Sequence, residues 1–170
     1  MLSESARATS AEEARFRVNY PNSKPRAVKV IALDHNAEQV VGRLAQLRWN
    51  GATFFTASAF AMAPRQSETF SMTGWLADLA GRAKNLLDEV NDADLVVMVA
   101  TAGANAQAAS IIGEACSLRR VMTTALVVGS AAASDEALSA SLMQLRPWAL
   151  MLVIASAEDY IEDMLLALQA

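Results

Sequence analysis

Short runs of consecutive apolar residues alternate along this chain with longer stretches in which apolar positions recur every three or four residues. Runs of this kind are typical of strands buried on both faces of a parallel sheet, and the wider spacing is typical of amphipathic helices. Five runs, each followed by a helical pattern, predict an α/β fold. The runs are residues 28–33, 52–60, 95–100, 121–128 and 148–155.

Capping signals mark several ends of the predicted helices. Asn36 followed by Gln39 is the pattern of a capping box, and Ser134 ahead of two acidic residues is a strong helix start. Pro147 would stop the helix that begins there. We expect helices over about 36–49, 74–87, 105–118, 134–146 and 156–168.

The alternation predicts a three-layer, doubly wound, Rossmann-like domain with a parallel sheet of about five strands. Right-handed crossovers leave few strand orders, and we expect the order 2-1-3-4-5. Strands 28–33 and 95–100 would then flank the switch point of the sheet. Ligands bind there in open α/β sheets, outside the carboxyl ends of the strands. Residues 34–36 and 101–107 are therefore the first place to look for a site.

The first 27 residues differ from the rest, because small, polar and charged residues dominate them. We expect residues 1–27 to form a loosely held arm and residues 28–170 to form a single domain. Within the arm, Arg15–Val18 could add an edge strand or grip a partner subunit. The stretch 61–73 reads as a loop.

Composition narrows the classes of function. The formal net charge of −4 argues against nucleic-acid binding, which favours a basic face. No stretch approaches the ~18 consecutive apolar residues of a membrane span, and the amino terminus has no apolar signal core. The single cysteine, Cys116, excludes an intrachain disulfide and fits a reducing compartment. We therefore expect a cytoplasmic protein, with Cys116 buried and inert.

Polar residues in the predicted loops are the candidates for ligand binding. His35 could act as a general base helped by its neighbours, or it could be an exposed loop residue without a role. The residues after strand 95–100 could bind a polar ligand, or satisfy loop backbone groups and cap the following helix. One histidine and one cysteine support neither a catalytic triad nor a metal site, and we expect no cofactor. The candidates are Asp34, His35, Asn36, Thr101, Gly103, Asn105, Gln107 and Ser130.

Well-known phosphate-binding motifs are missing from these loops. The turn after strand 28–33 contains no glycine, so it lacks the G-x-G-x-x-G of dinucleotide folds, and no P-loop run occurs. A receiver domain would need an aspartate and a lysine where this chain has Thr101 and Ser156. The turn after the first strand also lacks the hydroxyl-rich loop of a flavodoxin.

Two stretches resemble the nucleotide-binding domain of the FtsZ/tubulin GTPase family. Residues 28–44 are similar to its first strand and helix, and residues 93–128 to the segment that carries its glycine-rich phosphate loop. The resemblance covers about 28–156 and implies the same fold and a nucleotide-binding ancestry. The shared positions are Ala93, Asp94, Thr101, Ala102, Gly103, Ala108, Ala109, Glu114, Val127 and Val128.

The chain departs from this family in the loops that hold phosphate. The glycine-rich cradle is reduced to 104–107 without glycine, and Asp34 and His35 replace the glycine-rich first loop. Asp34 would repel a phosphate, although the helix start near Asn105 could still bind a small anion. We expect the family's second domain, which completes GTP hydrolysis, to be absent.

We therefore expect a non-enzymatic binding or regulatory module without GTP hydrolysis, acting as a homodimer or on a protein partner. Exposed aromatic and methionine side chains would supply the contacts, with anchors in Met62–Met72, Trp49 or Trp75. The alternative is a small-molecule-binding protein or enzyme that uses the crevice at the carboxyl ends of strands one and three.

Overall fold

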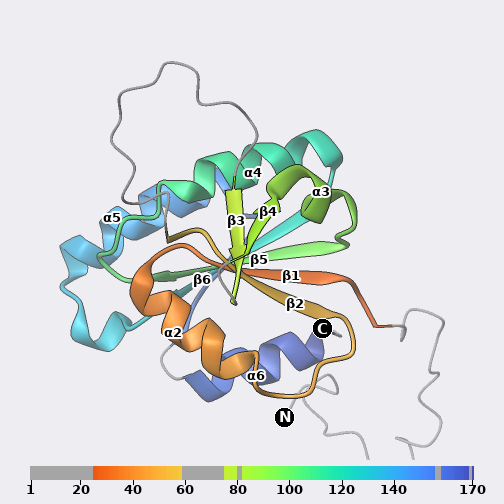
Figure 1. The fold of residues 1–170 in the computed structure, drawn as a ribbon. Helices are drawn as coiled ribbons and strands as arrows, with labels where there is room; N and C mark the ends of the chain where they lie inside the picture. The colour runs from red at the N-terminus through yellow and green to blue at the C-terminus, as the bar shows by residue number, and fades with distance from the viewer. Residues whose placement is uncertain (1–24, 59–74, 80–81, 156–157, 169) are drawn as a thin grey trace, which may run out of the picture.

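A seven-stranded sheet with helices on both faces forms the centre of the computed structural model, which describes residues 25–58, 75–79, 82–155, 158–168 and 170 (Figure 1). The strands are β1 (Val28–Ala32), β2 (Ala52–Thr56), β3 (Trp75–Asp78), β4 (Ala83–Asn85), β5 (Leu95–Thr101), β6 (Met122–Val128) and β7 (Met151–Ile154). The helices are α2 (His35–Leu44), α3 (Leu86–Asn91), α4 (Ala108–Arg119), α5 (Asp135–Leu145) and α6 (Glu158–Ala167). Two short 3₁₀ turns, η4 (Ser130–Ala132) and η5 (Arg146–Trp148), precede α5 and β7.

The strand order is β4-β3-β2-β1-β5-β6-β7. The five predicted strands pair in parallel, with β1 between β2 and β5 and with β6 between β5 and β7. The predicted α/β class is confirmed, but a wholly parallel five-stranded sheet is wrong. Two further strands, β3 and β4, extend the β2 edge in antiparallel pairing, so the sheet is mixed and its full order differs from 2-1-3-4-5.

The prediction of a helix over 74–87 is wrong, because this stretch forms the β3–β4 hairpin and only then the short helix α3. The Asp78 carboxylate accepts hydrogen bonds from the backbone N–H and the Nε of Arg82, which ties the two strands together. The Asn85 side chain accepts a bond from Leu87 N and caps α3 there. The apolar residues of 74–87 recur at helical spacing, but this stretch is divided between the hairpin and the start of α3. Pairing of β3 with the open edge of β2 outweighs the local preference for a helix.

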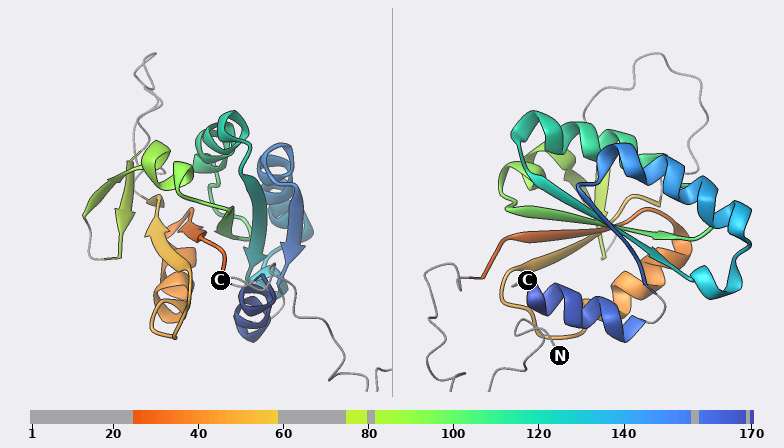
Figure 2. Two further views of the ribbon diagram at one scale, coloured as in Figure 1. Left: turned by 90° about the vertical axis from the view of Figure 1, so that its right-hand side faces the viewer. Right: turned by 180° about the vertical axis from the view of Figure 1, so that it is seen from behind.

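Helices cover both faces of the sheet, as a doubly wound fold requires. Helices α2 and α6 lie on one face, and α3, α4 and α5 lie on the other (Figures 1 and 2). The central strands β1, β5 and β6 are almost wholly buried, as their unbroken apolar runs predict. In β5, Val96, Met98 and Ala100 join the core under α4 and α5, and Leu95, Val97 and Val99 join the core over α2 and α6.

Several helix ends differ from the predicted ones. Asp34, not Asn36, is the N-cap of α2, and this helix ends at Leu44 rather than at Trp49. The Trp49 indole N–H instead donates to Leu44 O at 2.7 Å, and its ring packs against Phe54. Trp49 therefore packs within its own chain, whereas the sequence suggested it as an anchor for a partner.

Two more boundaries are also displaced. Helix α4 begins at Ala108 rather than at 105, with Gln107 as its N-cap. Strand β7 begins at Met151, because the residues around Pro147 form the turn η5. At the start of β1, Ala27 N–H donates to Asp94 Oδ2 at 2.9 Å, so the last residue of the predicted arm is attached to the domain.

Some predictions fall on residues outside the described part of the chain. They are the arm over residues 1–24 with Arg15–Val18, the loop 61–73 with Met62–Met72, and the first residues of the helices predicted over 74–87 and 156–168. Within the described ranges, no helix combines the length and the apolar character that crossing a membrane demands.

Candidate functional site

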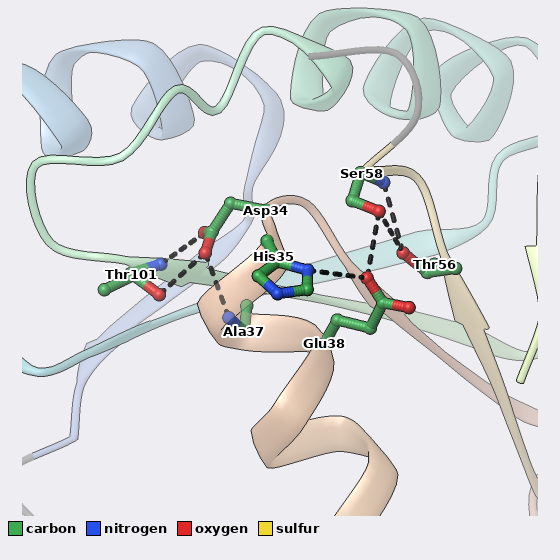
Figure 3. Close-up of polar contacts among 7 residues, drawn as sticks. All are labelled: Asp34, His35, Ala37, Glu38, Thr56, Ser58 and Thr101. Atoms are coloured by element: carbon green, nitrogen blue, oxygen red, sulfur yellow. Dashed lines mark hydrogen bonds and ion pairs between the residues drawn. The ribbon is translucent and has the colours of Figure 1, made fainter. Parts of the chain in front are cut away.

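Asp34 lies where β1 ends, beside the end of β5, at the position predicted for a site. Its Oδ1 accepts hydrogen bonds from Ala37 N at 2.9 Å and from the Thr101 hydroxyl at 2.8 Å. Its Oδ2 accepts a bond from Thr101 N at 2.7 Å (Figure 3). The residue is only 7% exposed. One carboxylate thus caps α2 and joins the ends of the two strands that flank the switch point.

This arrangement decides how Asp34 can be used. A carboxylate has acceptor positions on both oxygens, and here each oxygen is bonded to the chain itself. Its burial leaves little surface for contact with a ligand. Asp34 therefore acts as a structural latch between β1, α2 and β5, referred to below as the Asp34–Thr101 latch.

His35, the first residue of α2, points into solvent. Its side chain is 81% exposed, and Nδ1 lies 3.6 Å from Glu38 Oε2. The same Glu38 oxygen accepts a bond from the Ser58 hydroxyl at 3.0 Å, and Ser58 Oγ accepts a bond from the Thr56 hydroxyl at 2.9 Å (Figure 3). Sequence reasoning missed this chain of polar groups, because only the pairing of β1 with β2 brings Ser58 to α2.

The order of groups in this chain is wrong for nucleophilic catalysis. In a catalytic triad the imidazole stands between the hydroxyl and the carboxylate, so that it can take the hydroxyl proton. Here Glu38 stands between Ser58 and His35. The Ser58 hydroxyl therefore donates to the Glu38 carboxylate, and His35 is not placed to accept the hydroxyl proton as a general base.

The loop between β5 and α4 directs its backbone donors inward. Thr101 N donates to Asp34, Ala102 N to Val128 O, and Ala104 N to Thr101 O. Further along, Ala106 N donates to the Gln144 side chain, and Gln107 N to the Asn105 side chain. A phosphate cradle needs several amides that converge on the ligand. In this loop these amides hold the loop itself.

Gly103 has a structural use that the sequence did not reveal. Its φ of +83° lies in the left-handed region that favours glycine, and a Cβ there would approach Ala137 Cβ at 3.1 Å. Its N–H donates to the hydroxyl of the buried Ser141 at 2.8 Å. Gly103 therefore lets the loop pack closely against α5.

The remaining candidates do not converge on one point. Asn36, Asn105 and Gln107 are exposed, and Ser130 is half-buried in η4. Asp34 and Thr101 are bonded to each other, and so are the neighbouring residues Asn105 and Gln107, but no bond joins the two pairs. Among the described residues, no group of three or more side chains of the metal-binding types comes together.

Two features lie away from the switch point. Cys116 is fully buried in α4, as predicted, and burial raises the pKa of its thiol to about 12. A cavity of about 350 Å³ lies at the amino ends of the strands, between α4, β6 and η5. Gly113, Arg120, Thr123 and Trp148 are among its lining residues, and none of them belongs to the predicted site.

Comparisons with known family models and with curated protein sequences found no match. The resemblance to the FtsZ/tubulin family therefore stays a hypothesis that depends on the residues quoted above and on the α/β arrangement.

Proposed function

We propose that this chain is a non-enzymatic binding or regulatory module that acts through protein contacts and does not bind or hydrolyse GTP. In this proposal the domain keeps the arrangement of an FtsZ/tubulin-type nucleotide domain and has lost its phosphate loops. The observation that carries the proposal is the Asp34–Thr101 latch, which places a carboxylate between the strand ends where such a domain would receive phosphate.

The electrostatics of the switch point support this proposal. A phosphate oxygen ~4 Å from the Asp34 carboxylate would cost about 4 kcal/mol at an effective dielectric of ~20. No lysine or arginine occurs in 34–38 or 101–114 to offset this repulsion. The amides of 101–104, 106 and 107, which could bind phosphate in another conformation, are bonded within the protein.

The alternative, a small-molecule-binding protein or enzyme at the same place, has weaker support. His35 is exposed and separated from the Ser58 hydroxyl by Glu38. Asn105, three residues before α4, accepts a bond from Gln107 N, so its side chain already has a partner. An enzyme at this site would need a conformation in which the Asp34–Thr101 latch is open.

Calorimetric titration of the full chain with GTP and GDP, each with Mg²⁺, tests the proposal. We expect no saturable binding up to ~1 mM nucleotide, the concentration that corresponds to about −4 kcal/mol. Inorganic phosphate serves as a control that separates nucleotide recognition from binding of any anion at the start of α4. Micromolar or tighter binding of either nucleotide would overturn the proposal, and a turnover of GTP above the buffer rate would do so as well.

A further inference from the structure

Strand β7 forms one edge of the sheet and carries exposed apolar side chains on both of its faces. Met151 and Ile154 are 41% and 44% exposed, and Leu150, which directly precedes the strand, is 79% exposed. Residues 149–155 contain no polar or charged residue and no proline. An apolar, uncharged edge strand of this kind readily pairs with another strand.

The hydrogen-bonding groups of β7 divide between the two sides of the strand. Ala155 N donates to Val127 O of β6. Because successive residues of a strand alternate in direction, Met151 and Val153 direct their N–H groups toward β6 as well. The N–H and C=O groups of Leu152 and Ile154 therefore point away from the sheet, toward the open edge.

The opposite edge of the sheet is protected, which makes the β7 edge stand out. Strand β4 has only three residues, carries Lys84 and passes directly into α3. Short length and a lysine are common devices against edge pairing. Strand β7 has neither lysine nor any other charge. In the part of the chain that the structure describes, the β4 edge is therefore protected and no strand pairs with the outer side of β7.

Charges of opposite sign lie at the two ends of the β7 edge. Near its amino end, Arg146 opens the turn η5 that leads into the strand, and Arg119 and Arg120 end α4 just before the neighbouring β6. Helices α5 and α6 both start at the end of the sheet where β7 ends (Figure 2). Asp135 and Glu136 lie in the first turn of α5, and Glu162 and Asp163 lie in the second turn of α6. Among the described residues these arginines form no ion pair, and neither do the acidic residues Asp135, Glu136, Glu162 and Asp163.

We propose that two copies of this chain associate through antiparallel pairing of their β7 strands, which continues the sheet across a two-fold axis. Leu152 of one copy would stand opposite Ile154 of the second copy, and each such pair exchanges two N–H···O=C bonds. Val153 would lie on the axis beside its own counterpart. The partner named here rests on the proposed function, because it identifies the protein contact that the module makes.

The charges favour a second copy in this orientation over other occupants. Antiparallel pairing sets the basic end of one β7 beside the acidic end of the other, and two-fold symmetry repeats this match. Parallel pairing would bring like charges together. A C2 interface must be complementary to itself, and a strand with opposite charges at its two ends meets that condition.

The first experiment measures the oligomeric state of the full chain by sedimentation and light scattering. We expect a dimer that Ile154→Pro converts to a monomer, because proline removes an outward N–H and its ring blocks the approach of the second strand. Ile154→Lys should weaken dimerisation by ~100-fold or more through a buried charge at the interface. Leu47→Lys is the matched control, because Leu47 is 43% exposed and lies far from β7 in the chain, and it should leave the dimer intact.

Melting temperatures of these variants show that the fold survives. Ile154 donates nothing to β6 through its N–H, so both variants at Ile154 should melt close to the unaltered chain once dissociation is taken into account. Amide hydrogen exchange supplies a second measurement. Slow exchange at Leu152 and Ile154 should appear in the dimer and disappear on dilution.

The second experiment tests the charge match. Arg146→Glu and the double variant Glu162→Lys, Asp163→Lys should each weaken their homodimers by about fivefold to tenfold, as expected for exposed ion pairs. A mixture of the two variants should form heterodimers in preference to either homodimer, because the mixed pair restores both contacts. Higher salt should weaken the association of the unaltered chain.

Four results would overturn the dimer. The first is a monomer at ~100 μM, a concentration at which a dimer with a Kd of ~1 μM is mostly formed. The second is a dimer that both Ile154 variants leave unchanged, and the third is an equal loss of dimer with Leu47→Lys. The fourth is slow exchange of the Leu152 amide in a monomer. The last would show that another part of the same chain covers the edge. A monomer that ignores GTP leaves the proposed function standing, whereas a dimer that binds GTP tightly overturns the proposed function alone.

Discussion

Replacing Asp34 by alanine removes every bond of the Asp34–Thr101 latch at once. Loss of the N-cap bond to Ala37 N costs about 1 kcal/mol. Thr101 N and the Thr101 hydroxyl also lose their acceptor. Because Thr101 is half-buried and water can reach part of this pair, we take ~1–3 kcal/mol for the two donors together. We therefore expect a loss of about 2–4 kcal/mol in the free energy of unfolding. At about 2–4 °C per kcal/mol for a domain of this size, the melting temperature should fall by about 4–16 °C.

Conservative variants divide this loss into parts. Asp34→Ser keeps a cap for α2, but its shorter side chain does not reach Thr101. Asp34→Asn replaces one carboxylate oxygen by an NH₂ group, which faces an N–H or O–H donor and cannot accept its hydrogen bond. Thr101→Val removes only the hydroxyl bond, at about 1 kcal/mol. Combined with Asp34→Ala, it should add little further loss, because the two residues share one set of bonds.

Urea unfolding followed by far-ultraviolet circular dichroism measures these differences directly. The expected order of stability is the unaltered chain first, then Asp34→Ser and Asp34→Asn, then Asp34→Ala. An Asp34→Ala variant within about 0.5 kcal/mol of the unaltered chain, or more stable than it, would refute the latch. Such a result would instead point to a carboxylate held at some cost for a ligand.

Three further variants test the packing. Val97→Asp places a charge in a fully buried position of β5 and should prevent folding, so a soluble variant with an unchanged melting temperature would contradict the central position of this strand. Gly113→Ala sets a Cβ 2.5 Å from Trp148 Cβ and should lower stability by about 1–3 kcal/mol in urea unfolding, despite the better helix propensity of alanine. Burial raises the pKa of Cys116 from 9.0 to about 12, so the native thiol should resist a disulfide reagent at mildly alkaline pH until the chain unfolds. The native state keeps this proton while the unfolded chain loses it, so stability should fall from pH 9 toward 12, and more steeply than in Cys116→Ala.

The sequence alone determined the α/β class, the places of the five parallel strands and the burial of the central ones. Unbroken apolar runs such as 95–100 carry this information locally, because only a strand covered on both faces can bury every side chain. The burial of Cys116 followed from its helical spacing in the same way. The polar turns after β1 and β5 also placed Asp34 and Thr101 among the candidate residues at the switch point.

The tertiary structure decided everything that depends on which groups meet across the chain. The hairpin at 75–85 forms because β2 offers an open edge, and no local sequence pattern predicts that β2 lies at that edge. The use of Asp34 as a latch depends on Thr101, which is 67 residues away in the chain and comes within 2.7 Å only when β1 and β5 pair. The exposed edge of β7 likewise has no signature of its own, since an apolar run reads the same in the centre of a sheet and at its border. Strand position is a property of the whole sheet, so the available edge and the closed switch point become visible only after the chain has folded.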